Sequence, residues 1–180
     1  ANQLKMFRGE QLSYLDRKNL RDTLTQEQQA VYYSSWEYNV IHMAVAIPRL
    51  RTKGALLKAF RMSESRLNSC LEFLLESGLV HQTGDTYTCG TTENYLDRKS
   101  PFLRQLHMNT RTQAIHSFDR DNLEDAHYSM VITISRKDVV KIKKLINEYL
   151  GELIETARPS KEEAIYGLTI DFFDMEKDHT

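Results

Sequence analysis

The sequence predicts an α+β protein in which a winged helix-turn-helix is followed by a further helix and a βαβ-type unit. Two observations predict it. Residues 52–89 carry two amphipathic helix patterns separated by a short break, then two short β-rich runs around a glycine turn. Residues 128–173 carry a β-branched run, a long amphipathic helix and a second apolar run. Helix, turn, helix and hairpin is the element order of a winged helix-turn-helix.

Composition and length set the domain plan. The chain has 180 residues, of which 41% are hydrophobic and 27% charged. This suits one medium domain or two small ones with their own cores. We divide it into an N-terminal connector or peripheral helix (1–25), a winged-helix-like domain (26–90) and an α+β domain for assembly or sensing (91–180).

The charge and cysteine content limit the partners. A formal net charge of −1 argues mildly against strong, non-specific binding of DNA, although it permits a local basic face. Two cysteines, Cys70 and Cys89, support neither a disulfide framework nor a metal site, so we expect a reducing cytoplasm. No run of 18 apolar residues is present, so we expect no membrane partner.

A long helix is predicted over residues 26–47. Thr25 is its expected N-cap, and Gln28 three residues later completes a capping box. Pro48 ends it, because the residue before a proline is pushed out of helical backbone geometry.

Four aromatic residues cluster in this helix, and such a cluster can stack on bases or form core. Trp36 stands at helical spacing beside aliphatic neighbours, so we expect it in the core. Tyr33 and Tyr38 are the exposed candidates.

The second helix of the helix-turn-helix is the candidate reader of DNA. Its apolar stripe leaves a polar outer face, and six cations stand between Pro48 and Gly90 against four carboxylates. Cations meet phosphates, and polar side chains reach base edges. By analogy with guanine-reading arginines, Arg66→Ala should cost roughly 1–3 kcal/mol at a specific base. The predicted DNA contacts are Arg61, Ser65, Arg66, Asn68 and Ser69, with Thr83 and Thr86 on the wing.

The opposite interpretation also has support. Glu64 and Glu72 bracket the reading face and would repel phosphate, and the wing carries no lysine or arginine. A winged helix that serves only for packing or dimerisation therefore stays open.

The C-terminal domain is predicted to begin with a helix. Ser100 is its N-cap, Pro101 its first residue, and it runs to about Phe118. Its expected buried stripe is Phe102, Leu103, Leu106, Ala114, Ile115 and Phe118.

A βαβ-type unit is predicted to follow. Residues 128–134 and 164–173 are its expected strands, and Ser135 caps the long helix between them, with Asp138 at the third position. Two strands alone leave exposed edges and form a marginal sheet. The missing strands would come from another chain or from an upstream segment, and we therefore expect a homodimer.

No catalytic constellation is recognisable. The sequence has no phosphate-binding loop, nucleophile elbow, dinucleotide glycine pattern or paired histidines at metal-binding spacing. The acidic residues 119–125 lack the turn glycine of a calcium loop. We expect a protein that is not an enzyme and has no cofactor and no metal.

Several motifs resemble those of the Bdellovibrio–Fibrobacter paralogous family, which carries a C-terminal domain of unknown function. The opening signature is Tyr32, Tyr33, Ser34, Ser35 and Trp36 with Ile41 beyond; later matches are Gly78 with Leu79, His107, Ser129 and residues 165–173. The sequence departs from the family pattern at Ala126 and His127, where an arginine is frequent, and at Asp174, where proline is frequent. The resemblance implies a bacterial transcriptional regulator and brings no catalytic or binding residues.

The functional prediction is a transcriptional regulator whose winged helix contacts DNA, as a dimer. The alternative is a non-catalytic protein-interaction or ligand-sensing module in which the winged helix is structural. A small-molecule effector would then bind in a pocket near Trp36 and residues 100–118.

Overall fold

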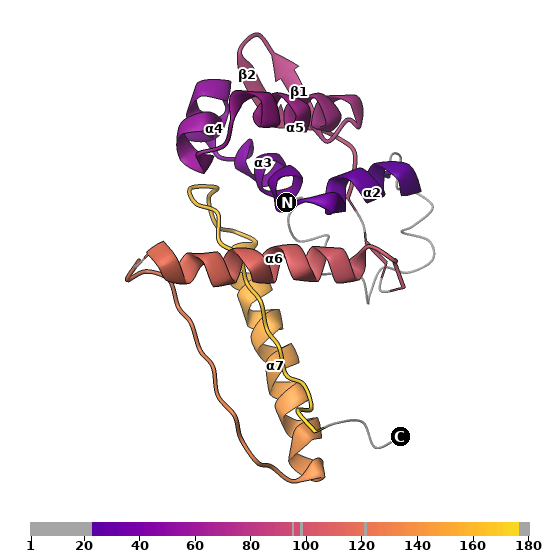
Figure 1. Ribbon diagram of the computed structural model, residues 1–180, viewed down its shortest axis with the longest axis vertical. Coiled ribbons are helices and arrows are strands. Elements are labelled where there is room, and N and C mark those ends of the chain that lie inside the picture. The colour runs from indigo at the N-terminus through magenta and orange to yellow at the C-terminus, as the bar shows by residue number, and fades with distance from the viewer. Residues whose placement is uncertain (1–22, 95, 98, 121, 177–180) are drawn as a thin grey trace.

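The computed structural model describes residues 23–94, 96–97, 99–120 and 122–176, so most of the predicted N-terminal connector lies outside the described residues. The fold is mixed helical with a small two-stranded antiparallel sheet, which confirms the α+β class (Figure 1). In chain order the elements are α2 (Gln26–Ser34), α3 (Trp36–Ala44), η2 (Pro48–Leu50), α4 (Lys53–Phe60), α5 (Glu64–Glu76), β1 (Val80–Thr83), β2 (Thr86–Cys89), α6 (Leu103–Ser117), η3 (Phe118–Arg120) and α7 (Arg136–Ala157).

The first helix begins as predicted but does not continue. Thr25 and Gln28 form the capping box, with the Thr25 hydroxyl accepting from the Gln28 amide at 3.2 Å. The prediction of one helix over residues 26–47 is wrong, because Ser35 adopts an extended backbone (φ −150°, ψ 152°) between α2 and α3. Five residues separate Tyr33 from Tyr38, which places them about 140° apart on a single helix. The break allows both rings to face the core.

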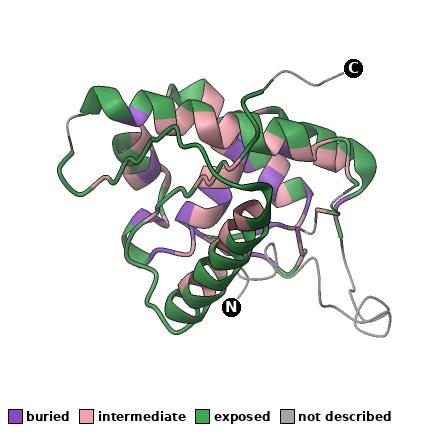
Figure 2. Cartoon of the chain, turned by 90° about the horizontal axis from the view of Figure 1, so that it is seen from below, coloured by how far each residue is buried: buried purple, intermediate pink, exposed green. Residues whose placement is uncertain are grey.

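The core is made by the elements from α2 to β2. Its cluster of buried apolar side chains runs from Leu24 to Tyr87, and the buried positions in Figure 2 gather there. Tyr33 is 1% exposed and Tyr38 8% exposed, so the prediction that they are exposed is wrong. Trp36 is only half-buried and lies outside the core cluster.

Three features of the C-terminal half differ from the prediction. Helix α6 begins at Leu103 with Phe102 as its N-cap, so the predicted cap at Ser100 and the predicted start at Pro101 are wrong. Helix α6 ends at Ser117, close to the predicted end, but Ile115 and Phe118 of its expected buried stripe are exposed. Helix α7 has the predicted cap, since the Ser135 hydroxyl accepts from the Asp138 amide at 3.2 Å. The strands predicted over residues 128–134 and 164–173 belong to no sheet among the described residues, so the βαβ unit is corrected to a helix between two extended segments.

The reason for this correction lies in where the second segment packs. The Arg49 guanidinium donates to the Glu163 carbonyl at 3.2 Å, and Arg111 forms an ion pair with Asp171, which is one of the contacts between this segment and α6. Figure 1 shows residues 122–134 apart from it, running from η3 to the start of α7. The two segments therefore cannot pair with each other. No helix within the described ranges has the length and apolar content needed to cross a bilayer.

Candidate nucleic-acid interface

Helices α4 and α5 each begin at a capped residue, and a short turn joins them. The Thr52 hydroxyl accepts from the Ala55 amide at 3.3 Å at the start of α4, and the Ser63 hydroxyl accepts from the Arg66 amide at 3.2 Å at the start of α5. Arg61 closes α4 in the left-handed conformation (φ 49°, ψ 36°), and its amide donates to the Leu57 carbonyl. This backbone geometry turns the chain so that α5 crosses against α3 and α4.

Helix α5 presents two faces of opposite character. Leu67, Cys70, Leu71 and Leu74 are buried against the core, as the sequence predicted. The opposite face is exposed and polar, and it consists of Ser65, Asn68, Ser69, Glu72 and Glu76. The first three of these are neutral and lie in the N-terminal half, and the two carboxylates lie in the C-terminal half.

Arg66 is engaged inside the molecule. Its Nε and Nη2 atoms donate to the two carboxylate oxygens of Glu37 at 3.3 and 3.4 Å. Its guanidinium carbon lies 5.0 Å from the centroid of the Tyr38 ring. The hydrogen bond to Glu37 raises the pKa of Arg66. These contacts fasten α5 to α3, a role that the sequence did not reveal because Glu37 stands 29 residues away.

Most other cations of this region are engaged too. Arg49 donates to Glu163, Arg51 donates to the Val45 and Ala46 carbonyls at 3.2 and 3.0 Å, and Lys53 pairs with Glu64 at 2.7 Å. That pairing lowers the pKa of Glu64. Lys58 and Arg61 are exposed, and their side chains make no hydrogen bond or ion pair with any other described residue. Of six cations, these two remain available to an outside partner.

The hairpin next to α5 carries little charge at its tip. Its register pairs Val80 with Cys89 and Thr83 with Thr86, and the loop between the strands turns through Gly84 at a φ of 58°. The Tyr87 amide donates to the Arg51 carbonyl at 2.7 Å, which ties β2 to the start of α4.

The seven predicted contacts thus divide into two groups. Six are exposed: Arg61, Ser65, Asn68 and Ser69 around the start of α5, and Thr83 and Thr86 on the hairpin. Arg66 is half-buried in its pair with Glu37.

A buried polar cluster lies under α5 and was not predicted. The Tyr32 hydroxyl contacts His42 Nδ1 at 3.0 Å, and the Tyr33 hydroxyl donates to Asn94 Oδ1 at 2.7 Å. Burial raises the pKa of Tyr33 to about 12 and lowers that of His42 to about 4, while a hydrogen bond with the Leu79 backbone acts in the opposite direction on His42. His42 is therefore neutral at physiological pH. No sequence motif signals this cluster, since its members come from separate segments.

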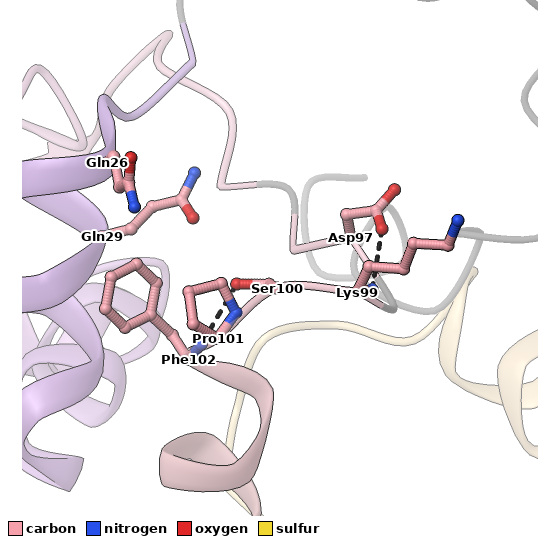
Figure 3. Close-up of a pocket in the computed structure, with 7 residues that line it drawn as sticks. All are labelled: Gln26, Gln29, Asp97, Lys99, Ser100, Pro101 and Phe102. Carbon is pink, nitrogen blue, oxygen red and sulfur yellow. Dashed lines mark hydrogen bonds between the residues drawn. The ribbon is translucent and has the colours of Figure 1, made fainter.

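The predicted small-molecule pocket finds only a partial counterpart. A hollow of about 300 Å³ lies between the start of α2 and the chain leading into α6, and Figure 3 shows Gln26, Gln29 and Phe102 among its lining residues. Trp36 does not line it. Two hydrogen bonds join lining residues of the hollow: the Asp97 carboxylate accepts from the Lys99 amide at 2.8 Å, and the Ser100 hydroxyl accepts from the Phe102 amide at 3.2 Å. The hollow offers no convergent set of groups for a ligand.

Within the described ranges, no three histidine, cysteine or carboxylate side chains are grouped so that they could hold a metal ion.

Comparison with known proteins identifies a family. No curated protein and no solved structure matches the chain. A family described as a domain of unknown function matches residues 16–175. This agrees with the resemblance to a family that carries such a domain, while the Bdellovibrio–Fibrobacter paralogous family itself stays a prediction. Because the match spans most of its length, the chain belongs to the family of the domain of unknown function DUF4423.

Proposed function

We propose that this chain is a transcriptional regulator that contacts DNA through a winged helix made of α4, α5 and the β1–β2 hairpin. The observation that carries the proposal is the uncovered polar face on the N-terminal half of α5. Ser65, Asn68 and Ser69 are exposed there while the other side of the helix is buried. In helix-turn-helix proteins the N-terminal residues of the second helix are the ones that reach base edges.

The charges around this face favour an approach in one direction. Lys58 and Arg61 stand at the end of α4, next to the start of α5, where they can meet phosphates. Glu64 also lies at the start of α5, but its carboxylate is paired with Lys53 at 2.7 Å, whereas Glu72 and Glu76 occupy the far end of the same face and would repel the DNA backbone. DNA would therefore meet the start of α5, with Asn68 available to pair with adenine.

Among the six cations of the described segment between Pro48 and Gly90, only two are unengaged, which implies a weak electrostatic contribution from the winged helix. Each neutralised phosphate lowers the slope of log K against log salt by about 0.9, so we expect a slope of about −2 per chain. Binding should accordingly depend on sequence more than on charge. Arg66 is assigned in this proposal to holding α5 on α3 instead of to a base, because its guanidinium is paired with Glu37.

The experiment is selection of a double-stranded site from random DNA at low salt, followed by fluorescence anisotropy. Asn68→Ala should reduce the affinity for the selected site about tenfold or more, and Arg61→Asn should weaken binding to all sequences alike. Asparagine tolerates the left-handed backbone at this position, so Arg61→Asn removes the charge without adding strain.

Matched controls lie in the C-terminal region. Asn122→Ala and Lys161→Asn remove the same groups from exposed positions far along the chain and should leave the affinity unchanged. Failure to select any site at low salt, or equal losses in the test and control variants, would contradict the proposal.

A second candidate function is an interaction or sensing module in which the winged helix is structural. The engagement of four of the six cations within the chain favours it, because these groups hold α5, α4 and the C-terminal segment in place. It predicts no selected DNA site, together with a complex that survives 1 M salt because apolar contacts are not screened.

A further inference from the structure

Helix α7 has one apolar stripe that is half-buried and a neighbouring face whose apolar side chains are exposed. It runs for 22 residues, and none of them is buried. Val140 is 70% exposed, Leu145 62% and Tyr149 51%, although all three are large apolar side chains. Figure 1 shows α7 extending away from the core elements. A long amphipathic helix gains most of its stability by packing, so this exposure indicates a missing partner.

Four exposed residues form one ridge along α7. Lys141, Leu145, Tyr149 and Glu152 follow each other at spacings of four, four and three residues, which places them on one face of a helix. The two apolar residues lie at the centre, a cation lies on the N-terminal side and a carboxylate on the C-terminal side. The centre of the ridge falls near Asn147. Lys141 lies about 9 Å before this centre and Glu152 about 7.5 Å after it, at about 1.5 Å per residue.

Because the ridge has a cation at one end and a carboxylate at the other, it is complementary to a second copy that runs in the opposite direction. Turned through 180° about an axis at the centre, the ridge brings Leu145 against the partner's Tyr149 and Lys141 against the partner's Glu152. A parallel copy would instead align lysine with lysine and glutamate with glutamate. We therefore propose that α7 is a homodimerisation helix, which packs antiparallel against α7 of a second copy around a two-fold axis near Asn147.

The charges of the whole helix favour the same arrangement. Its N-terminal half carries Arg136, Lys137, Lys141, Lys143 and Lys144 with one carboxylate, Asp138, whereas its C-terminal half carries Glu148, Glu152 and Glu155 and no cation. Antiparallel copies place each basic half beside an acidic half, and they also oppose the two helix dipoles. The existing pairs, Lys141 with Asp138 at 2.7 Å and Lys144 with Glu148 at 3.6 Å, are exposed and therefore weak, so they do not compete strongly.

The segment that leads into α7 adds the apolar area that such a dimer needs. Tyr128, Met130, Ile132 and Ile134 alternate with polar or smaller residues, so they share one face of an extended chain, and all four are exposed. No backbone–backbone hydrogen bond of residues 126–134 is found among the described residues. Two ridges alone would be small, so the exposed apolar side chains of this segment would have to add area for the interface to approach the size of stable dimers.

The experiment is charge reversal across the proposed axis, measured on the full chain by sedimentation equilibrium. The wild type should sediment at twice its 21.0 kDa mass. Lys141→Glu and Glu152→Lys should each raise the dissociation constant of the dimer about tenfold, because two attractive pairs become two repulsive ones. The double variant should return to within about twofold of the wild type, because it restores both pairs.

Lys143→Glu is the matched control. It makes the same charge change within α7, but it stands outside the ridge, so its dissociation constant should lie within about twofold of the wild type. All substituted positions are exposed, and circular dichroism verifies that each variant is folded. A monomeric wild type at about 100 µM would overturn the proposal, and so would single variants that match Lys143→Glu or a double variant that stays dissociated. None of the residues proposed to contact DNA is changed, so loss of the dimer is separable from a defect in α5.

Discussion

The two halves of the molecule use similar amphipathic helices to different ends. In α5 the apolar stripe of Leu67, Cys70, Leu71 and Leu74 is buried. In α7 the apolar stripe of Val139, Ile142, Ile146 and Leu150 is only half-buried, and Leu145 and Tyr149 on a neighbouring face stand more than half exposed. The difference lies in the neighbours. Helix α5 is covered by α3, α4 and β1, whereas α7 lies between two extended segments that form no sheet.

This contrast teaches that an amphipathic pattern marks a need for burial without identifying the partner. Large apolar side chains such as Tyr128 and Val131 stay exposed in the C-terminal half, whereas in residues 23–94 Val31 is the one large apolar side chain that is exposed. The N-terminal half satisfies its pattern within one chain. The C-terminal half presents an apolar surface of the kind that assemblies use.

The largest expected difference is between two leucine truncations, one in each half. Leu74→Ala removes a fully buried side chain from α5 and should lower the free energy of unfolding by about 2–5 kcal/mol. Leu145→Ala removes an exposed one from α7 and should cost less than about 0.5 kcal/mol in dilute, monomeric protein. Urea denaturation monitored by circular dichroism measures both. Equal losses would show that α7 is packed as fully as α5.

A pH effect on stability should arise from His42 in the N-terminal half. Burial lowers the pKa of His42 from its ordinary value of 6.5 to about 4 in the folded chain. Between these two values the unfolded chain therefore binds a proton more readily than the folded chain. The contribution of His42 to the free energy of unfolding is fully present above pH 6.5 and is lost as the pH falls toward 4, by roughly 3 kcal/mol. Unfolding free energies measured from pH 7 to pH 4 test this.

The matching variant is His42→Gln, which keeps an acceptor for the Tyr32 hydroxyl but does not titrate. Its free energy of unfolding should be lower at pH 7 and should change less with acidification. A slope unchanged from that of the wild type would assign the acid sensitivity to other groups.

The smallest effect is expected at a contact within the C-terminal half, between α6 and the segment that follows α7. Arg111 and Asp171 form a partly exposed ion pair, so Arg111→Gln should cost no more than about 1 kcal/mol. Amide hydrogen exchange should accelerate in residues 163–173 and stay unchanged in the hairpin. Arg158→Gln breaks an exposed pair with Glu155 inside α7 and should leave residues 163–173 unaffected. Faster exchange in both variants would argue against an anchoring role for Arg111.

Local signals in the sequence predicted the elements whose determinants are close in the chain. The capping residues Thr25 and Ser135, the buried stripe of α5 and the glycine that ends it all act within one or two turns. The break at Ser35 escaped because it depends on where two tyrosine rings pack, which is a property of the core.

The sequence predicted which residue types lie at the candidate site, but it did not predict which of their side chains are free to contact a partner. Exposure of Asn68 and Ser69 follows from helical periodicity, but the pairing of Arg66 with Glu37 requires knowledge of how α5 crosses α3. The strands expected over residues 128–134 and 164–173 have the right alternation. Whether such a segment joins a sheet depends on a neighbour, which a single chain does not specify.

The turn at Arg61 has a consequence for how this protein tolerates change. Arg61 is held at a φ of 49°. Glycine and asparagine adopt this left-handed backbone readily, so arginine there costs of order 1 kcal/mol relative to them. Selection for heat resistance alone would therefore tend to replace Arg61. Such a replacement would remove one of the two unengaged cations beside α5. Thermal tolerance would therefore favour a different residue at position 61 than contact with a polyanion does.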